Sequence, residues 1–292
     1  MYKVIYDCDN TMGMTGKDVD DGLTLMYLLG NEDVDLVGVT STHGNSSVED
    51  THSNNLNLMN YLDKEYKPIF KGGDIESGRI SEAAKYLAVA CGTYPGEITV
   101  LATGSMSNLY GAYLYDENFY KNVKNIIIMG GVLNKLSLGG VNIKELNLSC
   151  DYEAAYEVLK SKANITLFTG EVCLKALFGE KELDKLKGSD NKVYSYIYNN
   201  IKDWYSIMYE KFGMKGFCNW DAAAALYIVH KELFKTENVY INPIKTQLKE
   251  GIINIDSNNK NKYKVTMATD LVDLDKFNDL LLKSWANISL KE

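Results

Sequence analysis

The sequence predicts an α/β fold: a single domain built on an open, mostly parallel sheet with flanking helices. Two observations predict it. Short apolar runs rich in Val, Ile and Leu alternate along the 292 residues with longer runs of helical periodicity, and this alternation is typical of βαβ units that cover both faces of a parallel sheet. No internal repeat, linker or low-complexity tract interrupts it, so we predict one domain over residues 1–292.

The predicted elements follow one another in regular order. The first strand contains Val4–Tyr6 and ends at Asp7, and a buried helix starts at about Asp21. Later strands are predicted at VDLVGVTS (34–41), PIFKG (68–72), ITVLATGS (98–105), NIIIMGG (125–131), NITLFTG (164–170) and KYKVTMATDL (262–271). Further helices are predicted at 56–62, 81–90, near 109, at 151–159, 193–212, 219–230 and 275–285.

Composition and charge exclude several classes of protein. The formal charge of -8 and the lack of a basic stripe argue against a nucleic-acid partner. No window is apolar for long enough to span a membrane, and the first apolar run ends at Asp7 instead of continuing as a secretory segment. We therefore expect a cytoplasmic protein without membrane contact. The five cysteines are scattered with no CxxC pair, so we expect buried thiols and no zinc site or disulfide.

The stretch DCDNTMGMTGKDVDD, residues 7–21, contains five carboxylates in fifteen residues. It lies at a predicted strand-to-helix turn, where unpaired carboxylates repel one another more strongly as water is excluded. A solvated loop is the alternative, but the apolar runs on both sides favour burial. Because carboxylate oxygens are ligands of hard cations, the stretch predicts a cation site.

Other polar residues also follow predicted strands. In an open parallel sheet, ligands bind at the carboxyl ends of the strands. Carboxylates and amides in that place suit a hydroxylated ligand and a calcium or magnesium ion, whereas a phosphate prefers Lys, Arg or clustered backbone N–H groups. The residues that this rule selects are Asp7, Asp9, His43, Gly44, Asn45, Gly130, Gly131, Glu145 and Asn147.

Two known families resemble parts of this pattern. The first strand end, VIYDCDNT, resembles the hhhhDxDxT motif of haloacid-dehalogenase-type phosphatases, in which the first Asp is the nucleophile and magnesium is the cofactor. That family also needs a later Ser or Thr, a Lys and a distant acidic pair. Here the acidic pair, Asp20 and Asp21, follows the first motif closely.

Nucleoside hydrolases are similar over most of the chain. Their motifs, in order, are DxDPGxDD, a GN after the second strand, a GPLTN-like segment, MGG, EFN before a DPEAA helix, and a late HD or WD. The resemblance implies a Rossmann-like nucleoside hydrolase fold and hydrolysis of ribonucleosides to base and ribose; a nucleoside-binding protein without catalysis is the alternative. The matching residues are Asp7–Asp9, Asp20–Asp21, Gly44–Asn45, 103–108, Met129–Gly131, Glu145–Asn147, Asp151–Ala155 and Trp220–Asp221.

The resemblance implies one Ca²⁺ ion, which in this family binds the attacking water and two ribose hydroxyls. Asp9, Asp21 and Asp221 would be its carboxylate ligands, and Ile128 would supply a backbone carbonyl. Asp9 would also take the proton from the water, because calcium acidifies water less than zinc does and a carboxylate base is still needed.

The resemblance also implies the ribose contacts. Hydrogen-bond acceptors around the sugar favour the positive charge that develops on it as the glycosidic bond breaks. One contact is an Asn upstream of Glu145; Asn134 and Asn142 both qualify, and we favour Asn134 because it follows the MGG motif closely. The other ribose-binding residues would be Asp20, Asn45, Glu145, Asn147 and Asp221.

The acidic turn departs from the family pattern in length. Ten residues separate Asp9 from Asp20, where the family has three, and no Pro-Gly is present. The extra residues, 11–17, would be able to reach over the site as a lid, since their glycines permit unusual backbone angles. They also bring a further acid, Asp18, which we interpret as a solvated or helix-capping side chain.

Trp220 stands where inosine-uridine preferring enzymes have the His that donates a proton to the leaving base. Purine-specific relatives have Trp there and stack the base on the indole, so the resemblance implies purine nucleosides as substrates; core packing is the alternative. Trp204, Tyr205 and Tyr209 are candidates for a second aromatic contact, and His43 for a contact with sugar or base. The family also implies a homodimer or homotetramer.

Overall fold

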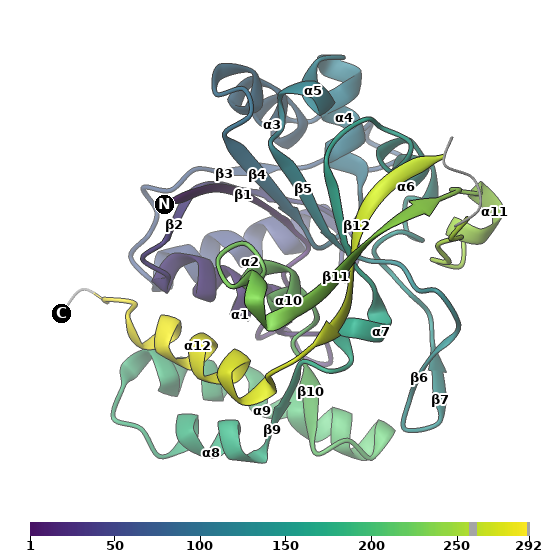
Figure 1. Cartoon of the computed structure of the whole chain (residues 1–292). Helices are drawn as coiled ribbons and strands as arrows, with labels where there is room; N and C mark the ends of the chain where they lie inside the picture. Colours follow the sequence, from purple (N-terminus) through teal and green to yellow (C-terminus); the bar gives the residue numbers. More distant parts are fainter. Residues whose placement is uncertain (257–261, 291–292) are drawn as a thin grey trace.

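The sheet at the centre of the computed structural model has eight strands in the order β11-β12-β8-β5-β4-β1-β2-β3, with helices on both faces (Figure 1). The structure describes residues 1–256 and 262–290. Neighbouring strands pair in parallel except β11 and β12, which are antiparallel at one edge. The strands are β1 (Tyr2–Cys8), β2 (Val34–Ser41), β3 (Ile69–Lys71), β4 (Ile98–Ala102), β5 (Asn125–Met129), β8 (Ile165–Phe168), β11 (Phe234–Ile241) and β12 (Tyr263–Leu271).

The side chains of β1 show how the sheet divides two cores. Val4 and Tyr6 belong to one buried cluster, which also contains side chains of α1, α10 and α12, whereas Ile5 belongs to a second cluster with side chains of α3, α4 and α6. Successive side chains of a strand point to opposite faces, and continuous burial is typical of a central parallel strand. The helices are α1 (Asp20–Gly30), α2 (Val48–Tyr61), α3 (Glu82–Thr93), α4 (Ser107–Tyr115), α5 (Phe119–Asn122), α6 (Tyr152–Leu159), α7 (Gly170–Cys173), α8 (Glu180–Lys187), α9 (Lys192–Phe212), α10 (Trp220–Leu226), α11 (Lys245–Leu248) and α12 (Leu274–Ala286).

The predicted fold class is confirmed, with a few strands that the sequence pattern does not predict. The edge strand β11 is one of them: its centre, Lys235–Asn238, is exposed, so no apolar alternation marks it. The predicted helix 219–230 is shorter, because α10 ends at Leu226. The other unpredicted strands form two antiparallel pairs: the hairpin of β6 (Leu136–Leu138) with β7 (Val141–Ile143), and β9 (Leu177–Gly179) with β10 (Gly216–Cys218).

The parallel pairing places the carboxyl ends of β1, β2, β4 and β5 at one edge of the sheet. The N-termini of α1 and α10 lie beside that edge, because the two helices pack together on the same face. The acidic residues selected from the sequence come from these strand ends and helix starts. Within the described ranges, no helix has both the length and the apolar character needed to cross a membrane.

Candidate active site

Three buried carboxylates meet where α1 and α10 begin. Asp20, Asp21 and Asp221 each offer an oxygen, and these oxygens lie within 4.8 Å of one another. All three residues are in the first turn of their helix, where the helix dipole favours negative charge. The side chains are 3%, 2% and 3% exposed, so water screens them little. We call Asp20, Asp21 and Asp221 the carboxylate cluster.

The charge of the carboxylate cluster is not balanced by basic side chains. In the ranges that the structure describes, no Lys or Arg forms an ion pair with any of its three members. Burial, and after it the negative charge of neighbouring carboxylates, raises the pKa of Asp20, Asp21 and Asp221 well above the usual range. Converging carboxylate oxygens without a protein counter-ion fit a hard divalent cation.

Asp9 lies next to the carboxylate cluster, directly after β1, and is fully buried. Its Oδ2 accepts a hydrogen bond from the backbone N–H of Asn45 at 2.6 Å. The Asn45 amide Nδ2 lies 3.3 Å from Asp9 Oδ1 and 3.2 Å from Asp21 Oδ2, so it bridges the two carboxylates. Burial raises the pKa of Asp9 to about 7, although the Asn45 N–H opposes this shift.

Gly44 makes this contact between Asp9 and Asn45 possible. A Cβ atom added at Gly44 would lie 1.9 Å from Asp9 Oδ2, closer than any side chain tolerates. The backbone therefore approaches the carboxylate only because residue 44 has no side chain. This explains in physical terms why a Gly-Asn pair follows β2.

Two residues that sequence reasoning missed hold Asp21. The Thr103 hydroxyl donates to Asp21 Oδ1 at 2.9 Å, and the Tyr6 hydroxyl donates to the same oxygen at 3.3 Å. Thr103 follows β4 directly, so the rule that ligands bind at the carboxyl ends of parallel strands would have selected it. Nothing in the sequence pattern indicated a role for Tyr6, because a residue within a buried strand is expected to be a core residue, and Tyr6 is indeed fully buried.

A cavity of about 240 Å³ opens beside these carboxylates. Its wall has a polar part and a larger apolar part, which fits a ligand with a hydroxylated part and a flat apolar part. The apolar wall includes residues of the β6–β7 hairpin and of one face of α9. The polar wall contains Asp18, Asp20, Asn45, Thr103, Lys144, Glu145, Asn147 and Asp221; the apolar wall contains Met129, Val132, Leu136, Leu138, Ile143, Leu146, Gly170, Trp204, Met208, Phe212 and Trp220.

Glu145 and Asn147 reach the cavity from a tight turn before α6. The Glu145 carboxylate accepts the backbone N–H of Leu148 at 3.0 Å and that of Ser149 at 3.2 Å. Burial raises the pKa of Glu145 to about 6, and these N–H groups limit the rise. Asn147 donates through Nδ2 to the Met129 carbonyl at 3.0 Å, so its Oδ1 remains as a hydrogen-bond acceptor for a ligand.

Several residues singled out from the sequence do not line the cavity. Asn134 is exposed, and its backbone N–H donates to Glu171 at 3.0 Å; Asn142 is exposed on β7. Tyr209 is 56% exposed on α9. Ile128 is fully buried in β5, next to the cavity-lining Met129.

The inserted segment after Asp9 is anchored on neighbouring helices. Asn54 of α2 donates through Nδ2 to the carbonyls of Asn10 and Met12, at 3.2 and 3.1 Å. Lys17 donates to the Asn45 carbonyl at 2.7 Å, so the segment also touches the loop after β2. Asp18 is the residue of this segment that lines the cavity, and burial raises its pKa to about 6. Asp18 is half-buried, and its Oδ1 accepts the backbone N–H of Val19 at 2.7 Å, just before α1.

Known proteins are similar to this chain in sequence and in fold. The sequence profile of the family described as inosine-uridine preferring nucleoside hydrolase matches residues 4–279. The chain belongs to this family. Its members act on N-glycosyl bonds, and the chain is an enzyme of this class. The match decides between the two families that the first strand resembles, and the phosphatase interpretation is not supported.

Individual relatives are named for different substrate specificities. Uridine nucleosidase 1 of Arabidopsis thaliana is 28% identical over 252 residues, which cover 75% of this chain and 74% of that protein. A solved plant nucleoside hydrolase has a TM-score of 0.86 at 22% identity and covers 98% of this chain and 99% of its own. A purine-preferring ribonucleoside hydrolase from Gardnerella vaginalis has a TM-score of 0.84 at 22% identity, with 98% of both chains covered. These two structures support the fold.

Proposed function

We propose that the enzyme hydrolyses the N-glycosidic bond of ribonucleosides, preferably purine nucleosides, and that it uses a bound Ca²⁺ ion. One observation carries the proposal: Asp20 and Asp221 of the carboxylate cluster line a cavity that also has an apolar, aromatic wall, and Asp9 contacts the third member of the cluster, Asp21. The polar wall suits a ribose and the apolar wall suits a base, so the glycosidic bond would lie between them.

The ribose hydroxyls would be bound by residues of the polar wall. Asp20, Asn45, Glu145 and Asn147 all line it, and carboxylate or amide oxygens accept hydrogen bonds from hydroxyl groups. These acceptors carry negative or partial negative charge, which favours the positive charge on the sugar in the transition state. Because Asn134 is exposed outside this wall, we leave it out of the proposed ribose contacts.

The cation would be held by Asp9, Asp21 and Asp221 and by the carbonyl of Ile128. Asp20 shares the cluster with Asp21 and Asp221, so it would lie close to the cation as well as to the sugar. A bound Ca²⁺ ion would supply positive charge that acidifies a water and orients it. Asp9 would accept the proton of the attacking water, because its carboxylate would lie beside the cation that binds that water.

The base would lie on the apolar wall, where Trp220 supports the purine preference. Trp220 directly precedes Asp221 of the carboxylate cluster, and its indole lines the cavity, so a planar base is able to stack on it. Trp204 lines the same wall from α9 and would be a second aromatic contact. No described His lines the cavity, so leaving-group activation by stacking is favoured over a His proton donor.

A substrate panel tests the proposal directly. Inosine, adenosine, guanosine, uridine and cytidine are incubated with the purified enzyme in Ca²⁺ or in a chelator, and the release of reducing sugar is measured. We expect purine nucleosides to have the highest kcat/KM and the chelator to abolish turnover. Turnover of uridine alone would overturn the purine preference, and binding without release of sugar would favour a nucleoside-binding protein. The cytoplasmic location and the homo-oligomer stay predictions.

A further inference from the structure

We propose that Arg79 is a positioning residue for ribose binding, although it lies outside the cavity wall. It would act through Asp151, which ends the turn that carries Glu145 and Asn147. The inference rests on the proposed function, because it assumes that this turn binds the ribose. It assigns to Arg79 a role in substrate affinity beyond its contribution to folding.

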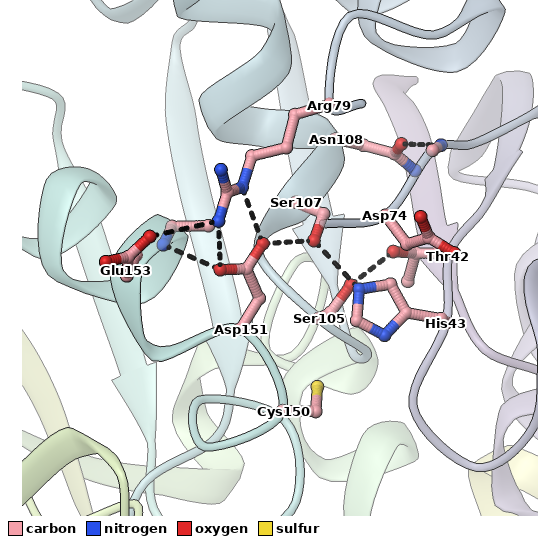
Figure 2. A network of polar contacts seen from close by, with 12 residues as sticks. Thr42, His43, Asp74, Arg79, Ser105, Ser107, Asn108, Cys150, Asp151 and Glu153 are labelled. Carbon is pink, nitrogen blue, oxygen red and sulfur yellow. Dashed lines mark hydrogen bonds and ion pairs between the residues drawn. The ribbon is translucent and has the colours of Figure 1, made fainter. Parts of the chain in front are cut away.

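Arg79 and Asp151 form a bidentate ion pair (Figure 2). Arg79 Nε donates to Asp151 Oδ2 at 2.7 Å, and Nη2 donates to Oδ1 at 2.8 Å. The Asp151 side chain is fully buried, so a compensating charge is needed, and the guanidinium supplies it in the planar geometry that a carboxylate prefers. Glu153 also approaches Arg79, at 3.5 Å, but from the exposed side.

The ion pair continues to the loop after β2 through a serine. The Ser107 hydroxyl donates to Asp151 Oδ2 at 2.6 Å, so its oxygen is free to accept, and His43 Nε2 lies 2.9 Å from it (Figure 2). The donor in that contact is therefore the imidazole Nε2–H. His43 directly precedes Gly44 and Asn45, which contact Asp9. The network thus reaches the loop that carries Asn45, another proposed ribose contact.

Asp151 also fixes the turn that contains Glu145. Its Oδ1 accepts the backbone N–H of Ala154 at 3.1 Å and caps α6. Inside the turn, the Ser149 hydroxyl donates to the Glu145 carbonyl at 2.6 Å, and the Cys150 N–H donates to the Leu146 carbonyl at 2.9 Å. Residues 145–151 are thereby one connected unit. Arg79 holds one end of it, and the ribose-binding side chains lie at the other end.

Loss of the guanidinium would therefore act on the ribose half of the cavity. Asp151 would keep a buried charge with only hydrogen-bond donors as partners, so the turn would shift toward water. The carboxylates at the reacting bond lie directly after β1 and in the first turns of α1 and α10, and they have no direct contact with Arg79 in the described structure. We expect substrate affinity to fall more than the rate of the bound complex.

The experiment compares Arg79→Ala, Arg79→Lys and Glu153→Gln in the full chain with Ca²⁺. For Arg79→Ala we expect the KM for inosine to rise roughly ten- to hundredfold, while kcat changes by less than about threefold. A shift of about 1 Å in the ribose-binding side chains is enough for an effect of this size. Guanidinium or methylguanidinium added to this variant should lower KM again. Arg79→Lys should give an intermediate KM, because lysine keeps the charge but not the bidentate geometry. Glu153→Gln is the matched control and should leave KM unchanged.

Two outcomes would overturn the inference. The first is a normal KM in a folded Arg79→Ala variant. The second is a lower melting temperature with an unchanged KM in Arg79→Lys. The second comparison remains informative if Arg79→Ala does not fold. The Kd for inosine, measured by equilibrium dialysis, distinguishes a failure of the Arg79 inference from a failure of the proposed hydrolase function. If the wild-type enzyme hydrolyses no nucleoside, a Kd that rises at least about tenfold in Arg79→Ala still supports the inference, and an unchanged Kd or no binding by the wild type overturns it.

Discussion

The backbone N–H of Asp221 donates to the Oδ2 of Asp20 at 3.2 Å, although 201 positions separate the two residues. The contact joins the first turns of α1 and α10. It brings together acids that no local pattern connects, and it does so inside the protein, where both are almost completely buried. The N-termini of the two helices stabilise part of this negative charge. Bound protons or a cation are needed to neutralise the rest.

The first prediction follows from competition between protons and a cation for these oxygens. Burial holds the pKa of Asp9 at about 7, against 3.8 for an ordinary Asp, and holds those of Asp20, Asp21 and Asp221 well above their usual range. Without a cation, the folded state therefore binds more protons than the unfolded state between about pH 4 and pH 7, and these groups make the free energy of unfolding fall as pH rises through that window.

Ca²⁺ should consequently stabilise the protein more at about pH 8 than at about pH 5. With Ca²⁺ at about 100 times its Kd, the gain is about 2.7 kcal/mol, which corresponds to several degrees in Tm. Calorimetry with Ca²⁺ or chelator at both pH values checks this. Equal Tm gains at the two pH values, or an undiminished gain in Asp21→Asn/Asp221→Asn, would contradict the assignment.

The second prediction concerns Asp9 as the general base. Asp9→Asn keeps an oxygen that is able to accept the Asn45 N–H, so the variant should fold, but it removes the proton acceptor. We expect kcat to fall by about 10²–10⁴-fold, the range for loss of a positioned acid or base. The matched control is Asp7→Asn, a buried change two residues upstream at a carboxylate held by Thr40 and Asn108 outside the cavity wall. Similar losses in both variants would show that the effect is structural.

The third prediction tests the close approach at Gly44. In Gly44→Ala the new methyl group would meet Asp9 Oδ2, so the carboxylate must turn away and lose the Asn45 N–H. We expect kcat/KM to fall by more than about tenfold, since the base would leave its productive position. Gly16→Ala is the control: its φ is +75°, so alanine is strained there too, but no atom lies within 4 Å of the new Cβ. Equal effects would point to backbone strain instead of a contact with Asp9.

The sequence predicted the site best where function follows directly from the order of strands. Asp9 and Asn45 come directly after a buried parallel strand or in the loop that begins there, so their shared edge follows from topology alone. The close position of Asp20 beside Asp221 was not predictable in this way. It depends on how α1 packs on α10, which is decided by tertiary contacts far apart in the chain.

The same reasoning explains what the sequence did not predict. Distance from the MGG motif favoured Asn134 over Asn142, but both are exposed outside the cavity wall. The β6–β7 hairpin near them has strands of only three residues, which the sequence pattern does not indicate. The position of Asp18 in the cavity wall was also not predictable. The segment before it is held by Asn54 of α2, and residue spacing does not indicate that contact.

The last prediction separates a stacking role for Trp220 from simple packing. If the indole activates the leaving base, Trp220→Ala should lower kcat for inosine and guanosine by roughly ten- to hundredfold, since stacking of a base on an aromatic side chain is worth about 1–3 kcal/mol. It should have little effect on p-nitrophenyl riboside, whose phenolate leaves without protonation. Tyr209→Ala on the exposed side of α9 is the control and should change neither substrate. Equal losses on the nucleosides and the activated riboside would mean that Trp220 only packs. In that case Trp204, which lines the same wall, becomes the next residue to test as the partner of the base.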